Sequence, residues 1–108
     1  MKVLPLLSTA VAAVAFSLPA LAQDADAATK TLKADGCTKC HAVDKSKKGP
    51  AYQKVAAKYK GKADAEAKLT EFLTKNPKVK LDDGSEEEHK AVKDKAQLAN
   101  LIKWVLAQ

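Results

Sequence analysis

The chain has 108 residues, enough for a single domain, since domains usually contain roughly 100–150 residues. Its 19 basic residues are all lysines and outnumber 13 acidic residues, which gives a net charge of +6. Hydrophobic residues make up 46% of the chain, which excludes an intrinsically disordered protein that is too polar to form a core. The two cysteines exclude a scaffold held by several disulfides.

The N-terminal segment has the three parts of a secretory signal peptide. Lys2 supplies a positive charge, and residues 3–18 contain no charged side chain. Ala20 and Ala22 then occupy the two small-residue positions of a cleavage site. We therefore expect cleavage immediately before Gln23.

Cleavage divides the chain into a signal peptide, residues 1–22, and a domain, residues 23–108. The alternative is a permanent membrane anchor, which needs roughly 20 apolar residues. Pro5 and Pro19 interrupt the apolar run, so we expect no membrane span after cleavage and a location in a bacterial periplasm. A domain this small buries only about 60–65% of its unfolded surface, so we expect a cofactor to complete its core.

Apolar side chains recur with helical spacing along most of the expected domain. The predicted helices cover residues 26–35, 51–59 and 63–74 and a segment that begins after Asp94. The last helix is the clearest, because Asp94 is a candidate N-cap with Gln97 three residues later. No segment alternates well enough to predict a strand, so the sequence predicts an all-α fold.

Residues 37–41 read Cys-Thr-Lys-Cys-His, which is the C-x-x-C-H motif of c-type haem attachment. The thiols of Cys37 and Cys40 can each form a thioether with one haem vinyl group. His41 then reaches the iron as the proximal ligand. A single motif predicts one covalent haem c per chain.

Three other chemistries use the same residues. Cys37 and Cys40 can form a structural disulfide in an oxidising compartment, whereas a thioredoxin-like redox pair needs a βαβ context that the pattern does not show. A zinc site needs four ligands, which Cys37, Cys40, His41 and His89 together would supply. Export, small size and the helical pattern favour haem over all three.

Three stretches of the sequence resemble the short bacterial class I cytochromes c. They are residues 36–41, residues 49–59 and residues 99–106, and together the similarity covers nearly all of the expected mature chain. The resemblance implies four to five helices wrapped around one covalent haem, with the first and last helices crossing near Gly36 and Trp104. It also implies an electron carrier and not an enzyme.

The resemblance also implies roles for individual residues. Cys37 and Cys40 would bind the haem covalently, and His41 would be the proximal ligand. The carbonyl group of Pro50 would accept the other imidazole N–H of His41 and fix the orientation of the ring.

The second axial ligand of that family is a methionine in a loop before the last helix. Met1 is the only methionine in this sequence, so the expected mature chain has none, and His/Met ligation is excluded. His89 lies 15 residues before Trp104, close to the family methionine's offset. We predict bis-histidine ligation by His41 and His89, with a low-spin iron. Its reduction potential should be low, because a thioether ligand raises the potential relative to imidazole.

Other assignments of the sixth position stay open. Residues 82–90 are very polar, and a histidine in such a run is usually solvated. However, Ser85 and Glu88 can cap a short helix that turns His89 and Val92 inward. An open iron site would bind or sense a diatomic gas instead. Lysine is a further possible ligand, and the candidates are Lys78, Lys80, Lys90 and Lys93.

Lysines are frequent around the proposed proximal half of the site. They are Lys39, Lys45, Lys47, Lys48, Lys54, Lys58, Lys60 and Lys62. Near an exposed haem edge, such a patch would steer the protein toward periplasmic redox proteins with acidic docking surfaces. The alternative is that these lysines serve only solubility and helix propensity. Export and the absence of arginine argue against nucleic acid, and no nucleophile-base arrangement indicates catalysis. We expect a monomer.

Overall fold

The computed structural model describes residues 10, 12–14 and 23–108. The cleavage site predicted after Ala22, and most of the expected signal peptide, lie outside these residues. The described residues form four α-helices, one short 3₁₀ turn and two short strands. In chain order they are α1 (Ala25–Ala34), η1 (Cys37–Lys39), α2 (Tyr52–Tyr59), α3 (Ala65–Lys75), β1 (Lys78–Lys80), β2 (Glu86–Glu88) and α4 (Lys95–Leu106). The predicted helices are confirmed to within about two residues at each end.

Aspartate side chains cap the first and last helices. The carboxylate of Asp24 accepts the backbone N–H of Ala27 at 3.0 Å, and that of Asp94 accepts the N–H of Gln97 at 2.9 Å. These bonds satisfy N–H groups that have no partner inside the helix. The N-cap predicted at Asp94 is confirmed.

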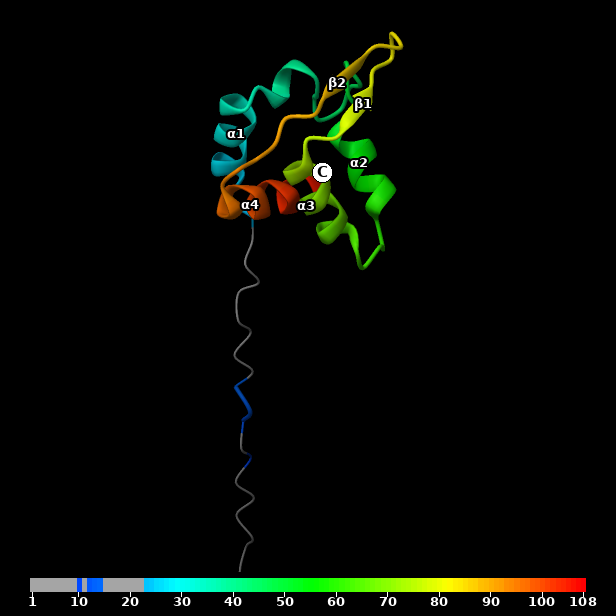
Figure 1. Cartoon of the computed structure of the whole chain (residues 1–108). Coiled ribbons are helices and arrows are strands. Elements are labelled where there is room, and N and C mark those ends of the chain that lie inside the picture. Colours follow the sequence, from blue (N-terminus) through cyan, green and yellow to red (C-terminus); the bar gives the residue numbers. More distant parts are fainter. Residues whose placement is uncertain (1–9, 11, 15–22) are drawn as a thin grey trace, which may run out of the picture.

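Helix α4 is the centre of the helical packing, because it contacts α1, α2 and α3 (Figure 1). Its apolar stripe is buried and consists of Leu98, Leu101, Ile102 and Val105. The first and last helices are also joined by hydrogen bonds. The amide group of Asn100 donates to the carbonyl oxygen of Asp24 at 2.8 Å, and Asn100 Oδ1 accepts the N–H of Asp24 at 2.6 Å.

Replacing Asn100 with alanine should lower the free energy of unfolding by about 1–2 kcal/mol, because two hydrogen bonds between α1 and α4 are lost. Chemical unfolding of the purified holoprotein would measure this change. Lys95→Ala, an exposed position on the same helix, is the matched control and should change stability by less than about 0.5 kcal/mol. Equal effects of the two substitutions would show that the Asn100 bonds contribute nothing.

The chain between α3 and α4 forms an antiparallel β-hairpin (Figure 1). Two predictions were therefore wrong: that the fold has no strand, and that residues 85–88 begin a short helix. The pairing places Lys78 opposite Glu88, so opposite charges face each other across the strands. Gly84 has a φ of 85°, a left-handed conformation that favours glycine in the turn.

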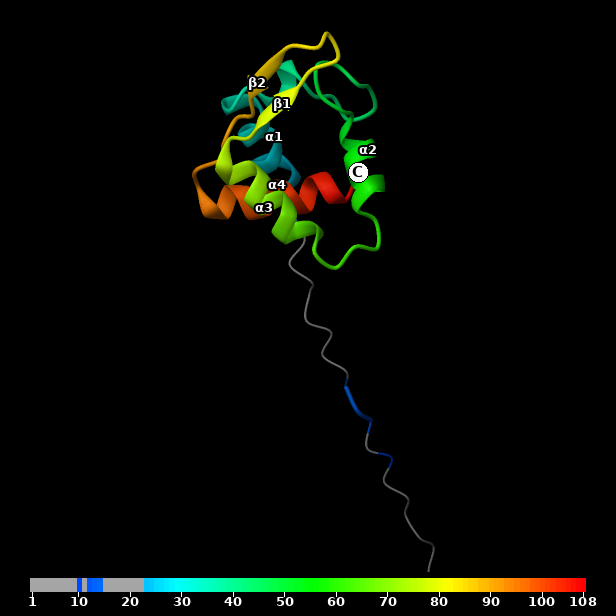
Figure 2. The ribbon, with the colours of Figure 1, turned by 45° about the vertical axis from the view of Figure 1, so that its right-hand side comes forward.

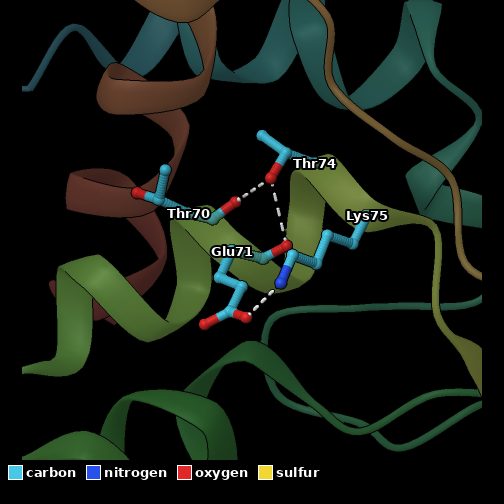
Figure 3. Close-up of polar contacts among 4 residues, drawn as sticks. All are labelled: Thr70, Glu71, Thr74 and Lys75. Carbon is cyan, nitrogen blue, oxygen red and sulfur yellow. Dashed lines mark hydrogen bonds and ion pairs between the residues drawn. The ribbon is translucent and has the colours of Figure 1, made fainter.

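Polar side chains on the exposed face of α3 form hydrogen bonds and an ion pair with other residues of the same helix. Thr74 donates to the carbonyl oxygen of Thr70 at 2.8 Å, and Lys75 pairs with Glu71 at 2.5 Å (Figure 3). Leu69, Phe72 and Leu73 of the same helix line the cavity described below, and of these Leu69 is buried whereas Phe72 is exposed.

Figures 1 and 2 show the hairpin at the end of the molecule away from α4, with α1 on one side and α2 on the other. This arrangement places residues from the hairpin opposite residues from the helices. Within the part of the chain that the structure describes, no helix has the length and apolar character needed to cross a membrane.

Candidate haem site

A cavity of about 580 Å³ lies between the helices and the hairpin. Its volume is within the range of roughly 300–1,000 Å³ that is typical of sites for small molecules and cofactors. All five residues that the sequence predicts for the site line it, namely Cys37, Cys40, His41, Pro50 and His89. Apolar side chains supply much of the remaining wall, including Leu32, Val55, Leu69, Val92 and Ile102. The cavity therefore suits a largely apolar group.

The two cysteines and His41 are held by a tight turn. Gly36 has a φ of 70° and ends α1 in a left-handed conformation. The backbone N–H groups of Cys40 and His41 then both donate to the carbonyl oxygen of Cys37, at 3.1 and 3.0 Å. Burial raises the pKa of the Cys37 thiol, and the nearby carboxylate of Asp35 raises it further.

The structure bears on two of the three alternative chemistries. The thiols of Cys37 and Cys40 are free and are not joined in a disulfide. Among residues 23–108, no group of three or more His, Cys, Asp or Glu side chains is arranged to hold a metal ion. The structure thus gives no support to a disulfide or a four-ligand zinc site at these residues.

The imidazole ring of His41 is fixed by a hydrogen bond and by stacking. Its Nδ1 lies 2.6 Å from the carbonyl oxygen of Pro50. Because a carbonyl oxygen only accepts, Nδ1 carries the proton, and Nε2 keeps its lone pair for a metal. The ring also stacks on Tyr52 with centres 5.1 Å apart, and Tyr52 in turn packs edge-on against Trp104.

Gly49 is a site residue that the sequence reasoning did not single out. A Cβ atom placed on it would lie 2.9 Å from both ring nitrogens of His41 and closer still to Cε1. The N–H of Gly49 also donates to the carbonyl oxygen of Cys40 at 2.8 Å. The backbone therefore passes directly against the imidazole, and only a residue without a side chain leaves room for it. Without the position of that ring, the sequence carries no signal for this requirement.

His89 follows β2 directly and is half-buried in the cavity. Its backbone N–H donates to the carbonyl oxygen of Pro77 at 2.8 Å, which fixes the base of the hairpin. Its Nδ1 lies 3.0 Å from the carbonyl oxygen of Lys90, so this nitrogen also carries the proton. Phe72 packs edge-on against the ring at 4.9 Å. The inward orientation therefore comes from a strand end and not from the predicted helix.

Burial lowers the pKa of His89 below its usual value. This shift favours the neutral ring, which is the form that binds a metal. A fully solvated surface histidine would not be buried in this way. Of the four lysines considered as alternative ligands, Lys80 and Lys90 line the cavity and both are exposed.

The ring centres of His41 and His89 lie 6.1 Å apart, and the ring planes are inclined at 52°. An imidazole nitrogen binds a metal ion at about 2.0–2.1 Å, so two imidazoles on opposite sides of one ion have centres roughly 6 Å apart. Both Nδ1 atoms are engaged by backbone carbonyl groups, which leaves both Nε2 atoms for the metal. The donor set and its spacing fit one iron between the two rings.

The sequence and the fold of this chain are similar to those of known proteins. The family model described as Cytochrome c matches residues 25–108. The chain is 40% identical over 76 residues to cytochrome c-551 from Pseudomonas aeruginosa. This alignment covers 70% of this chain and 71% of that protein.

Two solved structures have a similar fold. One is the class 1 cytochrome MtoD from Sideroxydans lithotrophicus ES-1, with a TM-score of 0.77, 49% identity and coverage of 80% of this chain and 97% of that chain. The other is cytochrome c552 from Nitrosomonas europaea, with a TM-score of 0.60, 26% identity and coverage of 72% and 95%. The predicted small helical class I fold is thus confirmed, with the hairpin as an addition.

Proposed function

Because this chain belongs to the cytochrome c family of small electron carriers with one covalent c-type haem, we propose that it carries single electrons in a bacterial periplasm. His41 and His89 are its axial ligands in this proposal. The observation that supports this ligand pair is the 6.1 Å separation of the two rings across the cavity.

The remaining site residues have separate roles. Cys37 and Cys40 attach the haem through two thioether bonds, and the carbonyl group of Pro50 orients His41 by accepting a hydrogen bond from its Nδ1–H. Residues 1–22 direct export and are removed. The protein is a monomeric carrier and not an enzyme, and acidic surfaces on redox proteins are its partners.

The bound haem supplies a reversible one-electron couple. This chain's own residues set the affinity of that couple for an electron, since two imidazole ligands give a lower reduction potential than an imidazole and a thioether. Met1 is the only methionine in the sequence, so the expected mature chain has no methionine side chain that could bind the iron. The proposed carrier therefore serves a low-potential couple with a low-spin iron.

Optical and low-temperature EPR spectra of the purified ferric holoprotein would test the ligand set directly. We expect low-spin signals, no methionine-to-iron absorption band in the red, and no spectral change when carbon monoxide is added to the reduced protein. A high-spin spectrum with rapid carbon monoxide binding would overturn the bis-histidine assignment. It would make the binding or sensing of a diatomic gas the leading function.

Acid should convert the low-spin ferric spectrum to a high-spin one. The unperturbed pKa of histidine is about 6.5. Burial lowers the pKa of His89 from there, and competition with iron lowers the apparent value further. The low-spin form should therefore be complete at neutral pH and lost only as the pH falls well below 6.5. A spectrophotometric pH titration measures the midpoint, and a midpoint above 6.5 would contradict ligation by His89.

A further inference from the structure

The imidazole ring of His41 is held by contacts from outside its own segment. Its Nδ1–H donates to the carbonyl oxygen of Pro50, nine residues further along the chain. Its face stacks on Tyr52, a ring on α2 that is only 7% exposed and that packs edge-on against Trp104 of α4. The plane of the proximal ring is therefore fixed by the protein itself.

The hydrogen bonds found for His89, in contrast, stay within residues 77–90. Its backbone N–H donates to the carbonyl oxygen of Pro77, and its Nδ1–H donates to that of Lys90, the next residue. An acceptor on the adjacent residue moves together with the histidine, so it does not anchor the ring to the helices. A contact from another element is needed to set the plane of this ring.

Phe72 on α3 supplies such a contact. The rings of Phe72 and His89 have centres 4.9 Å apart and planes inclined at 65°, which is the edge-to-face geometry that aromatic rings prefer. Within residues 23–108, the other ring paired with His89 is that of His41, the second proposed ligand. Phe72 is thus the neighbouring ring that holds His89 without itself being a ligand.

Phe72 contributes little to the core of the protein. It lies three residues after Leu69 and hence on the same face of α3, yet Leu69 is buried whereas Phe72 is 38% exposed. Leu69 belongs to the buried core cluster, and Phe72 lies outside it. Core packing therefore does not explain a large ring at this position, whereas the contact with His89 does.

We propose that Phe72 is a positioning residue for His89, whose ring sets the plane of the imidazole and holds it at the sixth position of the iron. This inference rests on the proposed bis-histidine carrier and adds to it the residue that fixes the distal ligand. Coordination alone does not fix the plane, because an imidazole can rotate about its bond to a metal. The inclination of 52° between the two histidine rings is thus set by their neighbours, Tyr52 for one and Phe72 for the other.

Low-temperature EPR of the ferric holoprotein tests the orientation, because the spread of g values in a low-spin haem depends on the angle between its two imidazole planes. Phe72→Leu keeps an apolar side chain but removes the ring edge. We expect this variant to shift the largest g value or to split the low-spin signal into two. Phe72→Tyr retains the ring and should keep the signal of the unmodified protein.

Tyr59→Leu is the matched control. It also replaces an aromatic ring with leucine, at a half-buried position that packs against the core. In the part of the chain that the structure describes, the Tyr59 ring pairs with neither histidine. This variant should therefore leave the g values unchanged.

The rate at which cyanide replaces His89 in the ferric holoprotein tests the hold on the ligand. At saturating cyanide this rate is limited by departure of the imidazole. Phe72→Leu should raise the rate roughly two- to tenfold, the factor that corresponds to the loss of one edge-on aromatic pair. Phe72→Tyr and Tyr59→Leu should keep the rate of the unmodified protein.

The proposal is wrong if Phe72→Leu leaves either the g values or the cyanide rate as in the unmodified protein, or if Phe72→Tyr behaves like Phe72→Leu. It is also wrong if Tyr59→Leu has an equal effect, since general loosening of the fold would then govern the ligand. Failure of the bis-histidine carrier itself would appear differently, as a high-spin spectrum of the unmodified protein.

Discussion

Replacing His89 with methionine should raise the reduction potential of the holoprotein by on the order of 100 mV, within the range of about 0.8 V that axial ligands cover. A thioether favours ferrous iron more than imidazole does. Methionine is also flexible enough to fill the space beside Phe72, which now packs against the His89 ring. Redox titration followed by absorbance would measure the shift.

His89→Ala provides the complementary result. This variant should become high-spin in the ferric state and should bind carbon monoxide when reduced, because the sixth position is then open. Lys90→Ala alters the neighbouring exposed residue without removing the imidazole, and it should keep the low-spin spectrum. A low-spin His89→Ala protein that excludes carbon monoxide would show that another side chain binds the iron. Lys80 and Lys90 would then be the candidates, since both line the cavity.

Gly49→Ala should impair haem attachment and lower the stability of any holoprotein that forms, by about 1–3 kcal/mol or more. The added methyl group would lie 2.9 Å from the ring nitrogens of His41, so the imidazole or the 40–49 backbone has to move. Movement of the ring would also lengthen the bond between His41 and Pro50, which is now 2.6 Å. Haem content per protein and chemical unfolding measure the two effects.

Gly61→Ala is the control for this substitution. Gly61 has a φ of 75°, but no atom lies within 4 Å of the position of an added Cβ. Its replacement should cost about 1–2 kcal/mol through backbone strain alone and should leave haem content and spectrum unchanged. If Gly49→Ala behaves like Gly61→Ala, steric contact with His41 is not the reason for a glycine at position 49.

The helices could be predicted from sequence because their signals are local. Apolar residues recur at helical spacing, and the capping aspartates lie immediately before their helices, as at Asp94. The hairpin was missed because its strands have only three residues each, and β2 consists of three exposed glutamates. Such a strand has no alternation of apolar and polar residues. The Asp83-Gly84 pair was the available signal, since this dipeptide is typical of hairpin turns.

Chemistry at the site was predictable to the extent that residue type determines it. Cys37, Cys40 and His41 were found through a contiguous motif, and His89 was found because the sequence has only one other histidine. What the sequence did not provide was the path by which His89 reaches the cavity. That path depends on the backbone bond between His89 and Pro77, and on the edge-on contact with Phe72, which are tertiary contacts without a local pattern.

The meeting of His41 and His89 across the cavity has a consequence for unfolding. The ring centres are 6.1 Å apart, although about 48 residues separate the two positions in the chain. An iron bound to both would close this stretch into a ring, as a disulfide does, and chain-entropy arguments value such a closure at about 4 kcal/mol. The closed ring contains α2, α3 and the hairpin, whereas α1 and α4 lie outside it. Release of His89 would therefore loosen the middle of the chain first and leave the pair of terminal helices packed together.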